Sequence, residues 1–223
     1  MRVDTVLFDL DGTLVEYERS SATVLDRAFE RAGVEPFFEV AEFEARYEDF
    51  FPTSDSIADL RERVFADIAS TKGRDPAVGR AVAREYAAER DHSRVRLLPG
   101  AEAVLDAMAD RPLGMVTNGD PGMQRPKLEA TGLIDHFDPI VYAGHDAPAK
   151  PDAAPFHLAL EGLGAEPSRA AYVGNDPDAD VGGANAAGLT SVWLRNGAPS
   201  EVDPDAAYII DRLDDLLETD LLG

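Results

Sequence analysis

The sequence contains no cysteine, which excludes disulfide bonds, thiolate catalysis and zinc sites built on cysteine ligands. It also has no run of about 18 apolar residues, so we expect neither a membrane-spanning helix nor a membrane partner. No charged and then apolar leader precedes the first predicted strand, which predicts a cytoplasmic protein. The 223 residues, 44% of them hydrophobic, are enough for one large domain or two modest ones.

Lysine is scarce as well: the chain has Lys72, Lys127 and Lys150, and arginine supplies the other positive side chains. The formal net charge is −22, an acid-rich and lysine-poor balance that resembles a protein from a salt-accumulating halophile, although an ordinary acidic protein is the alternative. Such a charge opposes binding to nucleic acid. The charge is unevenly spread, because residues 16–96 hold 18 acidic and 13 basic residues and the remainder holds 25 and 8.

The chain is organised around an apolar run that stops at two carboxylates, Asp9 and Asp11. Residues 3–8 are rich in strand formers without a helical period, as in a strand buried on both faces of a parallel sheet, and Gly12 ends the run. Because alternate residues of an extended chain point the same way, we expect both carboxylates on one side, at the end where α/β sheets bind ligands. Like charges so close favour a cation, and oxygen donors suit Mg²⁺, whereas an acidic turn is the simpler alternative.

Residues 16–96 are predicted to be helical. Four stripes of apolar residues at three- and four-residue spacings predict four amphipathic helices, which can form a small bundle. Ser20 or Ser21 caps the first helix and Gly33 ends it, Pro52 ends the second, and Pro76 precedes the fourth. The stripes are Leu25, Ala28, Phe29 and Ala32; Val40, Phe43, Tyr47 and Phe50; Ile57, Leu60, Val64 and Ile68; and Val78, Val82 and Tyr86.

From residue 97 onward, helix and strand alternate, which predicts an α/β fold with a parallel sheet and helices on both faces. The first strand belongs to this sheet, so residues 1–15 and 97–223 form the core and residues 16–96 are an insertion after the aspartate pair. The predicted helices are 101–110, 121–131, 154–163, 179–187 and a last helix that follows the final strand. The predicted strands are 113–117, 139–143, 170–173, 190–194 and, with a weaker pattern, 208–210.

Polar residues follow several of the later strands too. Thr117-Asn118 ends one strand, and Asp120-Pro121 begins the helix that follows. A hydroxyl, an amide and free backbone N–H groups at a helix N-terminus can bind an anion, whereas simple capping of the helix is the alternative. Lys150 precedes a helix, although a solvated surface lysine is the default interpretation. Gly174-Asn175-Asp176 follows another strand, with Asp180 four residues on, and a turn with a helix-dipole charge would explain this group alone. The recurrence at strand ends indicates one shared site.

These segments resemble the four motifs of the haloacid dehalogenase-like hydrolases, in the same order and spacing and across essentially the whole chain. The matching residues are Asp9-Leu10-Asp11-Gly12-Thr13, Thr117-Asn118, Lys150-Pro151, and Gly174-Asn175-Asp176 with Asp180. The resemblance implies a Rossmann-like core and a helical cap between the first two motifs, where residues 16–96 lie. It also implies Mg²⁺-dependent phosphoryl transfer from a small phosphorylated metabolite through an aspartyl-phosphate intermediate.

Carried over residue by residue, the resemblance makes Asp9 the nucleophile and a Mg²⁺ ligand. Asp11 would protonate the leaving group and then activate water, and its backbone carbonyl would reach the metal. Thr117, with Asn118, would hold the phosphoryl group, and Lys150 would neutralise charge on it and on Asp9. Phosphoryl transfer depends mostly on positioning and charge stabilisation, which a cation, a lysine and hydrogen-bond donors supply.

The fourth motif departs from the family pattern, which usually has aspartate directly after the glycine. This chain has Asn175 there, followed by Asp176. An amide oxygen can bind Mg²⁺ but adds no charge, so Asp176 is the favoured acidic ligand and Asn175 the alternative. Asp180 then resembles an acid that orients Lys150 or a metal-bound water.

Three other functions are compatible with the same fold. A haloacid dehalogenase would not need Asp11, because no proton is given to a leaving halide. A phosphosugar mutase would differ in how the inserted segment closes over the site, and the sequence does not show this closure. A non-catalytic binding protein would keep the fold, and Asn175 favours it while Asp9, Asp11, Thr117 and Lys150 oppose it. We therefore expect a phosphatase that acts on a small-molecule phosphate ester.

Overall fold

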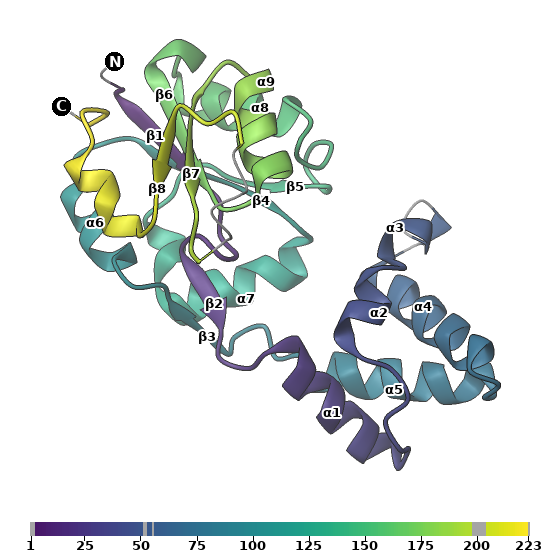
Figure 1. Cartoon of the computed structure of the whole chain (residues 1–223). Coiled ribbons are helices and arrows are strands. Elements are labelled where there is room, and N and C mark those ends of the chain that lie inside the picture. The colour runs from purple at the N-terminus through teal and green to yellow at the C-terminus, as the bar shows by residue number, and fades with distance from the viewer. Residues whose placement is uncertain (1–2, 51–52, 55, 198–203, 223) are drawn as a thin grey trace. The chain divides into compact units, whose positions relative to one another are not determined.

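The structure is a computed structural model that describes residues 3–50, 53–54, 56–197 and 204–222. The chain forms two compact units, Met1–Tyr17 with His92–Gly223 and Glu18–Asp91, which we call the α/β unit and the helical unit (Figure 1). These boundaries differ from the expected divisions after residues 15 and 96. They differ because residues 15–17 and 95–97 pair with each other as strands and so belong to the α/β unit.

A six-stranded sheet forms the centre of the α/β unit, and each of its neighbouring strand pairs is parallel. All four residues of the first strand are buried, as the apolar sequence predicts for a central strand. Phe8 lies beside Met115 on one side and Val173 on the other. The expected α/β class with a Rossmann-like parallel sheet is confirmed. In sheet order the strands are β5 (Ile140–Ala143), β4 (Leu113–Asn118), β1 (Thr5–Phe8), β6 (Ala170–Gly174), β7 (Thr190–Leu194) and β8 (Tyr208–Ile210).

Helices cover both faces of this sheet (Figure 1). Val6 and Phe8 of β1 face one hydrophobic core, shared with α6 and α7, while Leu7 faces a second core, shared with α8 and α9. This alternation buries a strand on both sides, as doubly wound sheets require. The helices are α6 (Ala101–Ala107), α7 (Pro121–Thr131), α8 (Ala154–Leu163) and α9 (Gly183–Ala186), with short 3-10 segments at η2 (Leu133–Asp135), η3 (Pro167–Arg169) and η5 (Leu213–Glu218).

A tight turn follows β1 and leads into a small two-stranded sheet. The Gly12 N–H donates to the Val15 carbonyl at 2.8 Å, and Gly12 adopts a φ of +78°, which favours glycine. A Cβ at this position would also lie 2.7 Å from the Asn175 side chain. This sheet pairs β2 (Val15–Tyr17) with β3 (Val95–Leu97) in antiparallel register. Three-residue strands are too short to show a period, which explains why the sequence did not predict them.

Two helices near the C-terminus differ from the prediction. The expected helix 179–187 begins earlier, as the π-helix η4 (Pro177–Gly182), and continues into α9. Its start is fixed by Asp176, whose Oδ1 accepts from the Asp178 and Ala179 N–H groups at 2.9 and 2.8 Å. The predicted last helix is the 3-10 segment η5.

The helical unit contains α1 (Ser21–Ala32), α2 (Val40–Glu44), α3 (Tyr47–Phe50), α4 (Ile57–Thr71) and α5 (Pro76–Glu89). Ser20, Ser56 and Asp75 cap α1, α4 and α5 by accepting backbone N–H groups, each cap contributing about 1 kcal/mol. The predicted second helix is two short helices, α2 and α3. The break expected at Pro52 lies outside the described residues.

The core of the helical unit is aromatic. Phe65 of α4 contacts Phe38, Phe43 and Tyr86 edge to face, with ring centroids 4.7, 5.4 and 5.8 Å apart, an arrangement that aromatic rings favour. Among the described residues of both units, no helix has the length and apolar composition needed to cross a membrane.

Candidate active site

Asp9 directly follows the central strand and is held there by backbone and side-chain contacts. Its N–H donates to the Val173 carbonyl of β6 at 2.9 Å, which continues the pairing of β1 one residue past the strand. The side chain is 8% exposed, and its Oδ1 accepts from the Lys150 Nζ at 2.8 Å. A nearly buried carboxylate therefore meets a buried ammonium at the carboxyl end of β1, where open α/β sheets bind ligands.

Lys150 joins Asp9 to a second buried acid. Its Nζ lies 2.6 Å from the Asp180 Oδ1, 2.7 Å from the Tyr172 hydroxyl and 3.1 Å from the Val116 carbonyl. Asp180 reaches this position beside Gly174, where a Cβ would lie 2.4 Å from the carboxylate. Asp180 also accepts the Asp176 N–H through Oδ2 at 2.9 Å, so both of its oxygens are bound.

Burial governs the electrostatics of this network. Burial raises the pKa of the Asp9 carboxyl to about 7, a shift that Lys150 opposes and Asp180 reinforces. Burial alone would lower the pKa of Lys150, but the charges of Asp9 and Asp180 outweigh it and raise the pKa. Burial, reinforced by Asp180, raises the pKa of Tyr172 well above its usual value, so its phenol remains protonated. With both carboxylates ionised, the group carries one excess negative charge, which favours a further cation.

Asn118, at the end of β4, fixes the loop that carries Lys150. Its Oδ1 accepts the Lys150 N–H at 2.9 Å, and its Nδ2 donates to the Lys150 carbonyl at 3.2 Å. Both ends of the amide are therefore engaged with the Lys150 backbone. The sequence interpretation gave Asn118 to the phosphoryl group, whereas in this structure its side chain anchors the lysine loop.

The Asp11 carboxylate contacts residues of α7 and not Lys150. Both of its carboxylate oxygens contact the Lys127 Nζ, at 2.8 and 2.6 Å, and Oδ2 also accepts from the Gln124 Nε2 at 3.0 Å. Gln124 donates to the Thr117 Oγ1 at 2.8 Å as well. Because β1 ends at Phe8, strand alternation no longer fixes the direction of Asp11, which explains why the two acids have different partners.

The two candidate metal ligands of the fourth motif have different surroundings. The Thr13 hydroxyl lies 3.3 Å from the Asp9 Oδ2 and 3.2 Å from the Asn175 Oδ1, so the Asn175 amide oxygen and the free side of Asp9 share one donor. Asp176 is exposed, and its Oδ1 caps η4. Among the described residues, no group of three or more histidine, aspartate or glutamate side chains could hold a metal ion. A metal here would need amide or backbone oxygens.

Four residues of this site were not assigned a role from the sequence: Thr13, Gln124, Lys127 and Tyr172. Lys127 carried one signal, because lysine is rare in this chain. Tyr172 lies in a buried strand, where an aromatic residue is ordinary core. Thr13 belongs to the first of the four motifs, although no role was assigned to it, and nothing in the local pattern around Gln124 distinguishes a site residue from a helix surface.

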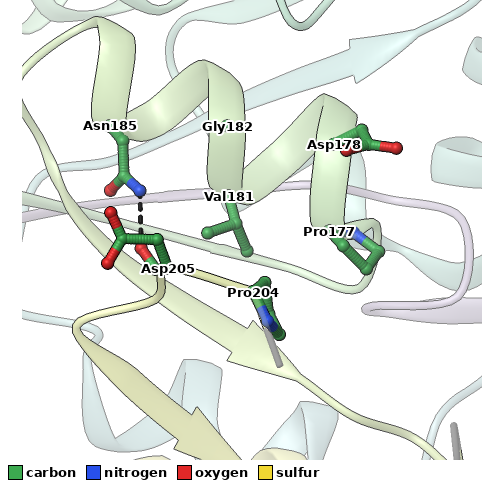
Figure 2. Close-up of a pocket in the computed structure, with 7 residues that line it drawn as sticks. All are labelled: Pro177, Asp178, Val181, Gly182, Asn185, Pro204 and Asp205. Atoms are coloured by element: carbon green, nitrogen blue, oxygen red, sulfur yellow. Dashed lines mark hydrogen bonds between the residues drawn. The ribbon is translucent and has the colours of Figure 1, made fainter. Parts of the chain in front are cut away.

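A pocket of about 310 Å³ on the α/β unit lies apart from these residues (Figure 2). Figure 2 shows the Asn185 side chain on one wall, with its Nδ2 donating to the Asp205 carbonyl at 2.6 Å. The residues described along its wall include Asp178 and Asp205 and no lysine or arginine. It is therefore poorly suited to an anionic phosphate ester.

The model of one protein family, haloacid dehalogenase-like hydrolase, matches residues 3–188. The chain therefore belongs to the haloacid dehalogenase-like hydrolases, as the resemblance of its four motifs predicted, and it is an enzyme of the hydrolase class. The match covers the helical unit and the α/β unit up to residue 188, and thus each of the segments that meet around Asp9.

Proteins that are similar to this chain over nearly its whole length include phosphatases. The chain is 35% identical to the phosphoserine phosphatase of Thermus thermophilus, with 96% of each chain covered. It is 30% identical to the ribulose-1,5-bisphosphate 5-phosphatase of Halopiger xanaduensis, covering 93% of this chain and 89% of the relative. A crystal structure of the HAD-hydrolase YfnB from Bacillus subtilis, bound to magnesium, has a TM-score of 0.79 at 22% identity, with 98% of each chain covered, which shows a shared fold.

Proposed function

We propose that the protein is a Mg²⁺-dependent phosphoric monoester hydrolase that acts on a small phosphorylated metabolite through an aspartyl-phosphate intermediate. The observation that carries this proposal is the buried contact between the Asp9 carboxylate and the Lys150 ammonium at the carboxyl end of the central strand. The phosphatase relatives, which align over nearly the whole chain, support phosphoryl transfer in preference to other hydrolytic chemistry.

In the first half-reaction an Asp9 carboxylate oxygen attacks phosphorus and the bond to the ester oxygen breaks. The Asp11 carboxyl gives its proton to that oxygen, so the product leaves as an alcohol. In the second half-reaction water attacks the aspartyl phosphate while the Asp11 carboxylate takes a proton from the water. The bond between phosphorus and Asp9 then breaks, which releases inorganic phosphate and leaves Asp11 protonated for the next cycle.

Lys150 and Thr117 serve the phosphoryl group in this scheme. Lys150 is buried and fixed by Asp180 and Tyr172, so its ammonium needs no rearrangement to neutralise charge that develops near Asp9. The Thr117 hydroxyl accepts from Gln124, which leaves its own proton available to a phosphoryl oxygen. Asn118 holds the Lys150 loop through its side chain, so we assign it to positioning the lysine.

The residues present fit Mg²⁺, which would polarise the phosphoryl oxygens and neutralise charge when bound. Oxygen donors gather on the side of Asp9 away from Lys150, where Asp9 Oδ2 and Asn175 Oδ1 share the Thr13 hydroxyl. The excess negative charge of the buried network also favours a cation. We propose Asp9, the Asp11 carbonyl and Asn175 as ligands. Asp176, which the sequence favoured, is the alternative, because its Oδ1 is engaged in capping η4.

Variants of the fourth motif separate these two ligand sets. If Asn175 binds the metal through its amide oxygen, Asn175→Ala should raise the Mg²⁺ concentration for half-maximal activity about tenfold or more. Asn175→Asp should lower that concentration by adding a charge. Asp176→Ala should change it little and instead weaken η4. The reverse ranking in Mg²⁺ titrations would assign the ligand to Asp176, and an unchanged response in all three would remove the fourth motif from the metal site.

The helical unit is proposed to act as a cap that helps select the substrate. It is inserted directly after the first motif, and arginine makes up a larger share of its residues than of those of the α/β unit. We further propose that the protein is cytoplasmic and adapted to high salt, which the net charge of −22 supports.

A first assay is Mg²⁺-dependent release of inorganic phosphate from p-nitrophenyl phosphate in high salt, followed by a panel of phosphorylated metabolites. The proposal expects turnover that requires Mg²⁺ and is lost in Asp9→Asn, because an amide does not attack phosphorus. Halide release from a haloacid without phosphatase activity would favour the dehalogenase alternative. Isomerised phosphosugar without free phosphate would favour the mutase, and neither activity would favour a binding protein.

A further inference from the structure

We infer that Lys127 and Gln124 are positioning residues for the acid–base group Asp11, and that they act on the protonation of the leaving group. This inference rests on the proposed phosphatase function. Both residues lie on α7, three positions apart, so they share one face of that helix. Lys127 is 2% exposed and Gln124 is 1% exposed. Burying an ammonium and an amide is costly unless each is well paired, so their partners matter.

The partner of Lys127 is the carboxylate of Asp11. Its Nζ lies 2.8 and 2.6 Å from the two carboxylate oxygens, and 4.8 Å from the centre of the Tyr17 ring in β2. Contact with both oxygens fixes the plane of the carboxylate as well as its position. The Asp11 side chain nevertheless remains 39% exposed, so it is held without being sealed from a substrate.

Gln124 connects Asp11 to Thr117. Its Nε2 lies 3.0 Å from the Asp11 Oδ2, 2.8 Å from the Thr117 Oγ1 and 2.9 Å from the Asn118 carbonyl, so its two N–H groups are shared among three acceptors. The Asn118 carbonyl can only accept, as can Asp11 when it is ionised, which fixes the orientation of the amide. The Gln124 Oε1, by contrast, has no hydrogen-bond partner among the described residues. Leaving a buried acceptor unpaired costs free energy. The contacts of the amino group offset that cost, which indicates that Gln124 serves to make them.

The geometry thus gives Asp11 a fixed direction from two buried donors on one helix. The proton that Asp11 gives to the ester oxygen matters most when the departing group is a poor anion, and least when it leaves readily as a phenolate. A displaced Asp11 should therefore slow esters of weakly acidic alcohols and phenols more than p-nitrophenyl phosphate. A loss of structure would slow all esters alike, so the leaving group separates the two cases.

The test measures kcat/KM for phenyl, 4-chlorophenyl and 4-nitrophenyl phosphate with Mg²⁺ in high salt, because kcat/KM covers every step through departure of the phenol. We compare Lys127→Met and Gln124→Met, which keep the side-chain length, with wild type. The matched control is Lys72→Met, which removes the same charge from an exposed lysine of the helical unit paired with Glu42 at 2.7 Å.

For Lys127→Met we expect roughly a tenfold or larger loss with phenyl phosphate and less than about threefold with 4-nitrophenyl phosphate. Gln124→Met should show the same gradient with a smaller slope, and Lys72→Met should show none. Equal losses across the three esters, or no loss, would overturn the inference. If Lys127→Met does not fold, Gln124→Met decides by the same gradient. Wild type without Mg²⁺-dependent hydrolysis of any ester would instead refute the proposed function.

Discussion

In the α/β unit the described buried residues include two aspartates, two lysines, a glutamine and several threonines, whereas in the helical unit the one buried polar or charged residue among those described is Glu89. The helical unit buries phenylalanine and tyrosine rings instead. Burying charge costs stability unless each group is paired, and in the α/β unit Lys127 is paired with Asp11 and Lys150 with Asp9 and Asp180. Buried charge in this protein is therefore concentrated where chemistry is proposed.

The surfaces differ in the same direction. Residues 18–91 hold 17 acidic and 11 basic residues, and the rest of the chain holds 26 and 10. The excess negative charge therefore belongs mainly to the α/β unit, which also carries the two buried carboxylates next to Lys150. Self-repulsion and the demand for a cation both fall on that unit.

We expect the largest difference between the stabilities of the two units when the salt concentration is lowered. On lowering NaCl from molar to physiological concentration, the Debye length grows from about 3 Å to about 8 Å, so repulsion over the acidic surface increases. We expect loss of structure that begins in the α/β unit, where the excess charge lies. Hydrogen exchange followed by mass spectrometry at each salt concentration checks this. An unchanged melting temperature across the range would remove the argument for adaptation to salt.

The next prediction removes one aromatic ring from each unit. Phe65→Ala should lower the free energy of unfolding of the helical unit by about 3–5 kcal/mol, because Phe65 is fully buried against three other rings. The matched variant is Phe137→Ala, whose ring contacts Phe8 of β1 with a centroid distance of 6.0 Å. It should destabilise the α/β unit instead. Denaturant unfolding read by hydrogen exchange in α4 and in β1 distinguishes the two; equal effects of both variants on both segments would mean that the units unfold as one.

The smallest expected effect concerns Glu89, a buried charged residue of the helical unit. Glu89 is 7% exposed and lies within 3.0, 3.7 and 2.5 Å of guanidinium groups of Arg19, Arg27 and Arg31. Because Arg27 and Arg31 are half exposed, solvent screens part of this attraction. Glu89→Gln should lower the free energy of unfolding by about 1–3 kcal/mol. Glu62→Gln, at an exposed pair with Arg84, should cost less than about 0.5 kcal/mol, and equal costs would show that burial adds nothing at Glu89.

The sequence predicted what depends on short-range pattern. The buried strand before Asp9, the alternation of helix and strand, and the family were all predictable, because the apolar run and the four motifs are contiguous in the chain. The helices of residues 21–32, 57–71 and 76–89 followed from their apolar stripes and caps. Those features are local, so one sequence is sufficient to predict them.

What the sequence did not predict depends on contacts between distant residues. Lys127 meets Asp11 across 116 positions and Lys150 meets Tyr172 across 22, and neither pairing leaves a local trace. The preference for Asp176 over Asn175 followed from charge alone. The structure adds that Asp176 caps η4 and that the Asn175 amide oxygen faces the Thr13 hydroxyl, which is the geometry that charge counting omits.

The most direct test of the account is to locate the covalent phosphoryl group. Asp11→Asn should still accept a phosphoryl group from a radiolabelled acyl phosphate, which needs no protonated leaving group, but should hydrolyse the intermediate slowly because its base is lost. With Mg²⁺ in high salt, we expect an acid-stable, hydroxylamine-labile label on Asp9 in this variant. The label should be absent when Asp9→Asn is added. A label that persists without Asp9, or none at all in a variant of an active phosphatase, would contradict the assignment of Asp9 as nucleophile.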